Sequence, residues 1–256
     1  MTFTPRLKVF ETLPTTMLEA RAQARAGEPE GTTIMARAQT SGRGRLGRSW
    51  LSEPGTGIYA TVILRPPADR RERFGELSLV SGIAICETVR SIGVANAKLK
   101  WPNDVLVDGR KIAGILLESD LAAEPPFVLV GIGVNFTKHA ERKLPDDLVP
   151  TYTGIADHMS ALPATEGRDP LASTLHTMLH WLAKRYDQWL AGGFEALLPA
   201  YADLDALKDT VVTISIRGGE SFTGTAEGVN SQGELLVRGP NGVIAHRAGE
   251  VERVKE

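Results

Sequence analysis

A short segment with three arginines on a glycine-rich backbone is the first place where this chain could do chemistry. The segment reads Gly42-Arg43-Gly44-Arg45-Leu46-Gly47-Arg48-Ser49-Trp50. Guanidinium groups form paired hydrogen bonds with carboxylates and phosphates, and a glycine backbone exposes its N–H groups to the same anions. The segment therefore predicts a loop that folds around a polyanion. A solvated arginine loop, or one that binds an RNA backbone, is the alternative for a short basic tract.

Two common nucleotide-binding motifs are excluded by the surroundings of this segment. It satisfies the pattern G-x-G-x-x-G, but a dinucleotide-binding turn opens a helix and is followed about 20 residues later by an acidic residue. Here serines, a proline and a glycine follow, and the next predicted strand, 57–65, contains no carboxylate. The chain also lacks the G-x-x-x-x-G-K-[ST] pattern of a P-loop.

A second cluster of reactive side chains lies about 50 residues further on. Lys100-Trp101-Pro102-Asn103-Asp104 is followed seven residues later by Lys111, with the turn-forming pair Asp108-Gly109 between them. This spacing places two lysines, an amide and a carboxylate on neighbouring strand ends, where a site can be rigid. A surface ion pair beside a turn is the alternative for Lys100 and Asp104.

The elements that must position these residues are a mixture of helices and strands. Three-and-four spacing of apolar residues, together with proline and glycine at the ends, predicts helices. Apolar runs bounded by turn residues predict strands. The predicted helices are 15–27, 74–93 and 170–193. The predicted strands are 32–40, 57–65 and 127–136, the last of which is apolar enough to lie in mid-sheet. Residues 97–119 are predicted to form a strand, a Pro-Asn-Asp turn and then a hairpin closed by Asp108-Gly109. Residues 137–168 are predicted to be irregular.

The pattern of predicted elements changes from about Asp209 onward. Short β-rich runs follow one another, separated by turns such as Gly-Pro-Asn-Gly. Turn signals at this spacing are typical of a small β barrel or roll. We therefore predict an α+β fold in two domains, 1–208 and 209–256.

Charge and cysteine content exclude several functional classes. The 29 lysines and arginines against 31 acidic residues give a net charge of −2, which offers no general attraction to nucleic acid or to an anionic membrane. The single cysteine, Cys86, lies within an apolar predicted helix and cannot form an internal disulfide. No signal peptide or membrane span is evident in the sequence. We expect a soluble cytoplasmic protein that binds neither nucleic acid nor membrane.

Four segments of the chain resemble, in order and spacing, the signature segments of biotin protein ligases. These segments are Gln39-Thr40-Ser41-Gly42-Arg43-Gly44-Arg45-Leu46-Gly47-Arg48-Ser49-Trp50, Lys100-Trp101-Pro102-Asn103-Asp104, Gly109-Arg110-Lys111-Ile112-Ala113-Gly114-Ile115-Leu116 and Gly131-Ile132-Gly133-Val134-Asn135. The stretch 228–237, with Gly249-Glu250-Val251, is similar to the small SH3-like domain of that family. The likeness spans nearly the whole chain, and four motifs in one order are far more specific than one glycine pattern.

The resemblance implies a mixed sheet with flanking helices, related to class II aminoacyl-tRNA synthetases, followed by an SH3-like barrel. It also implies a reaction in two steps. Biotin and MgATP first give biotinyl-5′-AMP and pyrophosphate, and a lysine of a biotin carboxyl carrier domain then displaces AMP. The implied partners are therefore ATP, biotin, Mg²⁺ and a carboxylase subunit, with a homodimer as a further possibility and no resident metal site.

The same resemblance assigns roles to individual residues. Lys111 is expected to bridge the biotin carboxylate and the α-phosphate, while Arg43 and Arg45 engage biotin and the phosphates. Arg48 and Trp50 are expected to extend the ATP pocket. Lys111, Arg45 and Asp104 would be the catalytic residues, with Asn103 and Asp104 positioning the nucleotide, the metal or the attacking lysine. The other residues implied in the site are Thr15, Thr16, Gln39, Gly42, Gly44, Gly114 and Asn135.

One departure from the family pattern affects the biotin end of the site. Where the family usually has Ser-Thr-Asn, this chain has Thr15-Thr16-Met17, so that a thioether replaces an amide. The change removes one hydrogen bond, for which about 1 kcal/mol is a typical scale, or places Met17 against the biotin rings.

Two other functions are considered beside biotin ligation. A lipoate ligase or octanoyl transferase has a related catalytic fold, but transfer through a thioester needs a reactive cysteine, and Cys86 is expected to be a small buried apolar side chain. A biotin-responsive repressor needs an N-terminal helix-turn-helix, and the 14 residues before Thr15 are too few for one. We therefore expect a ligase without operator binding.

Overall fold

The computed structural model describes residues 3–137, 151–159, 169–216, 219 and 221–254. Most of the stretch predicted to be irregular, at 138–150 and 160–168, lies outside the described residues. The described part of that stretch contains one short 3-10 helix, Ile155–His158.

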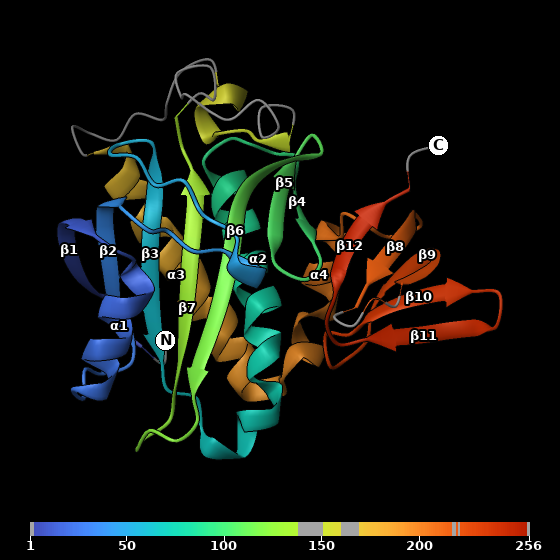
Figure 1. Cartoon of the computed structure of the whole chain (residues 1–256), viewed down its shortest axis with the longest axis horizontal. Helices are drawn as coiled ribbons and strands as arrows, with labels where there is room; N and C mark the ends of the chain where they lie inside the picture. The colour runs from blue at the N-terminus through green and yellow to red at the C-terminus, as the bar shows by residue number, and fades with distance from the viewer. Residues whose placement is uncertain (1–2, 138–150, 160–168, 217–218, 220, 255–256) are drawn as a thin grey trace.

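A seven-stranded mixed sheet forms the centre of the larger part of the molecule (Figure 1). Its strand order is β1-β2-β3-β7-β6-β5-β4, in which β1 and β2 are parallel and all other neighbours are antiparallel. The strands are β1 (Arg6–Leu13), β2 (Thr32–Gln39), β3 (Gly57–Leu64), β4 (Ala97–Lys100), β5 (Asp104–Val107), β6 (Arg110–Asp120) and β7 (Phe127–Asn135). The predicted mixed α+β fold is confirmed, and so is the mid-sheet place of β7.

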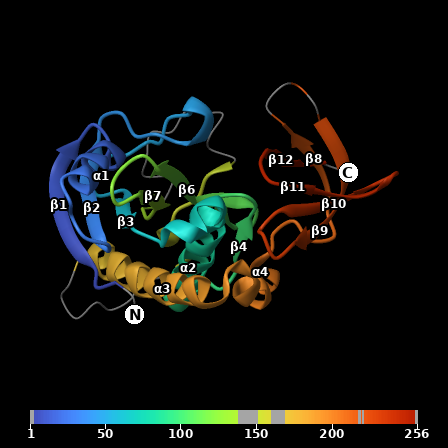
Figure 2. The ribbon, with the colours of Figure 1, turned by 90° about the horizontal axis from the view of Figure 1, so that it is seen from below.

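Helices cover both faces of this sheet, as the two views show (Figures 1 and 2). α1 (Thr16–Arg25) packs on β2, β3 and β7 from one side. α2 (Leu77–Ser91), α3 (Pro170–Gly192) and α4 (Leu198–Leu204) lie on the other side, where α2 packs against both of the other helices. Among the helices that the structure describes, none has both the length and the hydropathy that crossing a membrane requires.

The sequence prediction missed the first strand, since it assigned no helix or strand before residue 15. β1 pairs with β2 along its whole length, from Arg6 opposite Thr32 to Leu13 opposite Gln39. Leu7 and Val9 are 46% and 50% exposed, whereas Lys8 between them is half-buried and donates to Gln23 and Glu28. An edge strand is expected to turn its polar side chains to solvent. Because Leu7 and Val9 point outward instead, the sequence pattern did not indicate a strand here.

A second sheet of five antiparallel strands forms a separate lobe, at the right of Figure 1. Its order is β11-β10-β9-β8-β12, made by β8 (Val211–Ser215), β9 (Ser221–Val229), β10 (Leu235–Gly239), β11 (Gly242–His246) and β12 (Glu250–Arg253). The lobe is tied to the large sheet by a hydrogen bond from Trp101 Nε1 to the carbonyl oxygen of Gly233, 3.0 Å long. The predicted change from mixed to β-rich structure is confirmed.

The core between α2 and α3 contains a buried polar contact that gives a stability prediction. Trp189 is fully buried and donates from Nε1 to Oε2 of Glu76, 2.7 Å away. Trp189→Phe leaves the buried carboxylate one donor short, so we expect it to lower the free energy of unfolding by about 1–3 kcal/mol in urea titrations. Trp181→Phe, in a half-buried position of the same helix, should cost less than about 1 kcal/mol. Equal losses in the two variants would contradict the assigned role of the Glu76 contact.

Candidate functional site

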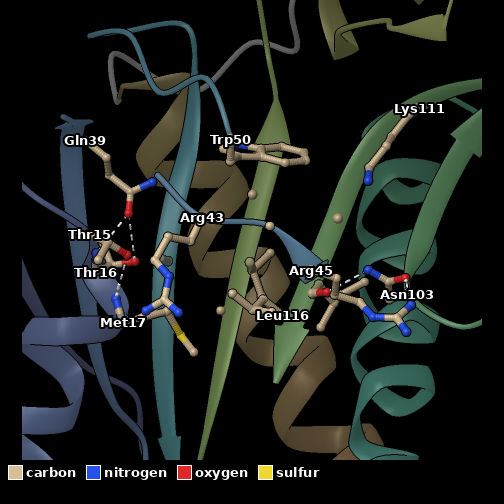
Figure 3. Close-up of a pocket in the computed structure, with 17 residues that line it drawn as sticks. Thr15, Thr16, Met17, Gln39, Arg43, Arg45, Trp50, Asn103, Lys111 and Leu116 are labelled. Atoms are coloured by element: carbon tan, nitrogen blue, oxygen red, sulfur yellow. Dashed lines mark hydrogen bonds between the residues drawn. The ribbon is translucent and has the colours of Figure 1, made fainter. Parts of the chain in front are cut away.

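Two adjoining cavities lie where the glycine-rich segment crosses the sheet, and Figure 3 shows the residues that line the first of them. The first, of about 460 Å³ including space open to solvent, lies over β3, β6 and β7 beside the start of α1. The second, of about 1380 Å³ including space open to solvent, extends toward the β4–β5 turn and β12. Five residues line both cavities: Gly44, Arg45, Trp50, Asn103 and Lys111. Both sequence clusters therefore meet at one junction.

The inner end of the first cavity is a network of hydrogen bonds at the N-terminus of α1. Thr15 caps this helix, and its hydroxyl accepts from the backbone N–H of Met17. Gln39 Oε1 accepts from the backbone N–H of Thr16 at 2.8 Å, and Gln39 Nε2 donates to Ser52 Oγ at 2.8 Å. Both threonines are buried. This end therefore offers fixed polar groups and the partial positive charge of a helix N-terminus to a small polar ligand.

The sides of the first cavity are apolar. Met17, 3% exposed, lies on the floor, where a Cβ atom added to Gly131 would come within 2.9 Å of its sulfur. Ile132 and Leu116 form the neighbouring surface. A flat apolar slot with a polar inner end suits a ligand that has a polar head and a hydrocarbon body.

The glycine-rich segment is a small hairpin that crosses the sheet. Backbone bonds run from Trp50 N to the carbonyl of Gly42, 2.9 Å, and from Gly44 N to the carbonyl of Arg48, 2.7 Å. A Cβ atom at Gly42 would lie 2.3 Å from the Trp50 carbonyl oxygen, so this position requires glycine. Gly42 lines neither cavity and instead allows the close turn.

Lys111, on β6, points into the junction between the cavities. Its Nζ lies 2.6 Å from Asp104 Oδ1 and 5.3 Å from the centre of the Trp50 ring. The side chains of Lys111 and Asp104 are 33% and 25% exposed. The ammonium group is thus positioned by a carboxylate and an aromatic face, while remaining accessible to an incoming anion.

Arg45 reaches the same junction from the loop. Its Nη1 donates to Asn103 Oδ1 at 2.8 Å, and Asn103 Nδ2 donates to the Ile115 carbonyl at 2.9 Å, which fixes the amide. Burial lowers the pKa of Arg45, and the Asp104 carboxylate opposes that change. The guanidinium remains protonated at neutral pH because its ordinary pKa is far above 7. Its charge is therefore available in a partly dry site.

The Trp50 ring sits on two glycines of the sheet. A Cβ atom at Gly133 would lie 2.4 Å from the ring, and one at Gly114 would lie 3.0 Å from it. These glycines therefore leave the room that the ring occupies between the two cavities.

Gly133→Ala should consequently displace the Trp50 ring, because the added methyl group overlaps the indole. With fluorine-labelled tryptophan, we expect the NMR resonance of Trp50 to shift and broaden while the other tryptophans are unchanged. Gly75→Ala is the matched control, since nothing lies within 4 Å of its added Cβ. An unchanged Trp50 resonance in Gly133→Ala would refute this packing.

The other predicted residues lie around this centre at different depths. Asn135 is buried at the end of β7, lines the second cavity, and donates from Nδ2 to the Lys111 carbonyl at 3.4 Å. Arg43 lines the first cavity, is half exposed, and lies 3.5 Å from Glu118. Arg48 is 70% exposed and forms an ion pair of 2.5 Å with Glu250 of the β-rich lobe. Residues of the glycine-rich segment 42–50 and of the segment 100–111 therefore line the same pair of cavities.

Several lining residues received no role in the sequence prediction. The second cavity is also bounded by Lys100, Thr151, Tyr152, Glu250, Val251 and Glu252. Glu250 and Val251 belong to a stretch that the family resemblance covered, and that likeness was the available signal. Spacing alone could not place them, because more than 130 residues separate them from Lys111 along the chain. Cys86 is buried, as predicted for a small apolar side chain. Burial strongly raises the pKa of its thiol, so the thiol is not a nucleophile at neutral pH.

Comparison with known proteins identifies the family. Residues 9–135 match the biotin/lipoate A/B protein ligase family, and residues 212–254 match the biotin protein ligase C-terminal domain. Biotin–[acetyl-CoA-carboxylase] ligase of Mycobacterium tuberculosis is 31% identical over 98% of this chain and 90% of its own length. The corresponding ligase of Paracoccus denitrificans is 32% identical over 85% of this chain and 88% of its own.

The fold agrees with these sequence matches. A solved structure of biotin protein ligase from Aquifex aeolicus in complex with biotin and ATP superposes with a TM-score of 0.81, at 24% identity, over 99% of this chain and 100% of that one. Both the seven-stranded sheet and the small β-rich lobe are covered by this match. The chain belongs to the biotin protein ligases of the biotin/lipoate A/B protein ligase family.

Proposed function

We propose that this chain is an ATP-dependent ligase that converts biotin and ATP into biotinyl-5′-AMP and transfers the biotinyl group to a lysine of a biotin carboxyl carrier domain. The observation that carries the proposal is the junction at Lys111 and Arg45, where two cavities meet between cations. One cavity suits a small molecule with a polar head, and the other is large enough for a nucleotide.

The first step brings one anion to another. The biotin carboxylate oxygen forms a bond to the α-phosphorus, and the bond from that phosphorus to the bridging oxygen of pyrophosphate breaks. Lys111 and Arg45 reduce the repulsion between the carboxylate and the phosphate in a partly buried setting, where each charge has a larger effect than in water. Asn103 keeps Arg45 aimed at the junction.

Biotin occupies the first cavity in this proposal. Its ureido head meets Thr16 and Gln39 at the start of α1, with Thr15 and the Gly44 backbone as further polar neighbours. Its apolar rings lie against Met17, which is buried on the cavity floor. The thioether therefore contributes packing where the family pattern has an amide.

The nucleotide occupies the second cavity. Trp50 and Asn135 form its walls, Gly114 leaves room for the Trp50 ring, and Arg48 supplies further positive charge near the phosphates. Arg43 lines the first cavity, where it is placed to engage biotin. Mg²⁺ would arrive on the phosphates of ATP, since this ion keeps several waters and binds one or two carboxylates at most in such sites. Asp104 lines this cavity and is the nearest carboxylate to Lys111.

In the second step, the amine of the carrier lysine attacks the biotinyl carbonyl. An amide bond forms, and the bond from the carbonyl carbon to the AMP oxygen breaks. Asp104 lines the second cavity beside Lys111, so it is suited to orient the incoming ammonium group. The ammonium loses one proton to solvent before the attack, and the nitrogen loses a second to the departing AMP phosphate as the amide forms.

The test is incorporation of labelled biotin into a biotin carboxyl carrier domain, with and without ATP. We expect incorporation only with ATP and only at the carrier lysine. Lipoate and octanoate are assayed in parallel on a lipoyl domain, because the related ligases of the superfamily use them. Transfer of lipoate or octanoate without transfer of biotin would overturn the proposal.

Four further expectations belong to the proposal. The catalytic domain extends to residue 208 and the SH3-like domain from 209 to 256; the enzyme acts in the cytoplasm; it does not bind operator DNA; and it can form a homodimer. Limited proteolysis tests the domain boundary, and cell fractionation tests the cytoplasmic location. Gel-shift assays test for operator binding, and light scattering tests for the homodimer.

A further inference from the structure

One wall of the second cavity comes from a short segment, 151–153, that has almost no secondary structure of its own. Thr151 and Tyr152 line the cavity. A single parallel bridge joins Tyr152 to Lys111 at the start of β6, and the backbone N–H of Thr153 donates to the Lys111 carbonyl at 3.0 Å. A pairing of this length is marginal by itself, so side chains must hold the segment beside Lys111.

The side chain of Thr153 is the anchor of this wall segment. The residue is fully buried, and its hydroxyl lies 3.1 Å from Asp157 Oδ2 and 2.8 Å from His158 Nε2. A hydroxyl has one hydrogen, and an ionised carboxylate only accepts. The Thr153 hydroxyl therefore donates to Asp157 and accepts from His158 Nε2. With both partners in place, the buried hydroxyl is held in one orientation.

His158 connects the wall segment to the hairpin that carries Lys111. It is the last residue of the 3-10 helix Ile155–His158, and its Nδ1 lies 3.5 Å from Oδ2 of Asp108, in the turn between β5 and β6. Its side chain is only 11% exposed. His158 lines neither cavity, so it can affect a ligand there only through the residues that it holds.

We propose that His158 is a positioning residue for the second cavity, and that it keeps Thr151 and Tyr152 in place beside Lys111 through its hydrogen bond to Thr153. This inference rests on the proposed function, in which the second cavity receives the nucleotide. Loss of the hydrogen bond should loosen one wall of that cavity. The biotin cavity should be unaffected, because neither the wall segment nor His158 lines it.

The experiment replaces His158 by side chains that keep one ring nitrogen position or neither. His158→Ala should raise the KM for ATP in biotin-dependent pyrophosphate exchange by about tenfold, the scale of one lost hydrogen bond, with kcat and the KM for biotin unchanged. His158→Gln should recover the wild-type KM, because its amide nitrogen is as many bonds from the backbone as Nε2 of histidine. His158→Asn, whose amide nitrogen ends at the position of Nδ1, should not recover it.

The control is His176→Ala, which removes an exposed histidine of α3 that lines neither cavity and should leave both KM values unchanged. The circular dichroism of each variant must match that of the wild type. If His158→Ala does not fold, the comparison of His158→Gln with His158→Asn is the test. An unchanged KM for ATP in His158→Ala, or the same KM for ATP in the glutamine and asparagine variants, would overturn the proposal.

A double variant tests whether His158 acts through Thr153. Thr153→Val removes the hydroxyl at nearly constant volume and should itself raise the KM for ATP. Adding His158→Ala to Thr153→Val should then raise this KM no further, because the contact is already lost. Additive increases would show that His158 acts by another route, and would contradict the proposal.

Amide hydrogen exchange separates this inference from the proposed function, because it needs no substrate. The Thr153 N–H, which donates to Lys111, should exchange with solvent about tenfold faster in His158→Ala and His158→Asn than in the wild type, His158→Gln and His176→Ala. If this difference appears but no biotin is transferred, the positioning role stands and the proposed function fails. If biotin is transferred and the Thr153 N–H exchanges alike in all five proteins, the role of His158 is refuted.

Discussion

Lys111→Ala is expected to reduce biotin-dependent pyrophosphate exchange by about 1000-fold, the upper range for loss of one fixed electrostatic contact. Lys111 lines both cavities, and its ammonium lies at the point where a carboxylate must approach a phosphate. The variant also leaves Asp104 without the cation 2.6 Å away, so that a carboxylate faces the incoming anions. Exchange of labelled pyrophosphate into ATP measures this step alone.

The control for Lys111 is its neighbour on β6. Arg110→Ala removes one positive charge from the adjacent position, which points to the other face of the sheet and lines neither cavity. We expect exchange in Arg110→Ala to remain near the wild-type rate. Near-normal exchange in Lys111→Ala would exclude Lys111 from the chemistry and would undermine the proposed reaction.

The meeting of the two sequence clusters could be predicted from the chain, because each cluster lies beside a predictable turn. Asp108 and Gly109 have φ angles of 50° and 77°, as the predicted hairpin turn requires, and this turn places Lys111 next to Asp104. The bond between Arg45 and Asn103, 58 residues apart, could be expected only from the family resemblance. The spacing of residues along the chain predicts the geometry of a local turn. Contacts between distant residues depend on the order of the strands in the sheet, which the spacing does not give.

The parts that the sequence did not reveal share a physical reason. β1 is an edge strand whose exposed leucine and valine break the alternation that marks a half-buried strand. α4, of seven residues, has too few turns for a periodic pattern to be recognised. Glu250 reaches Arg48 only because the small lobe docks beside the loop. In each case, tertiary contacts decide the structure, and the local sequence carries little information about them.

Arg45→Gly should release biotinyl-5′-AMP into solution. Arg45 joins the glycine-rich loop to Asn103 of the β4–β5 turn, so that the loop spans the junction where the mixed anhydride forms. Loss of this hydrogen bond, with glycine in place of a long side chain, should leave the loop mobile and the adenylate unprotected from water. Loss of a hydrogen bond to a charged group corresponds to roughly tenfold to 100-fold faster escape of the intermediate.

The measurement separates free adenylate from enzyme-bound adenylate by rapid filtration, and also follows labelling of lysines on an unrelated protein in the same solution. Both signals should rise in Arg45→Gly, because released biotinyl-5′-AMP reacts with any accessible amine. Arg37→Gly is the control, since this arginine pairs with Glu11 on the exposed side of β2, remote from both cavities. Retention of the adenylate in Arg45→Gly at the wild-type level would show that the loop does not depend on the Asn103 contact, and that protection of the intermediate must come from another part of the site.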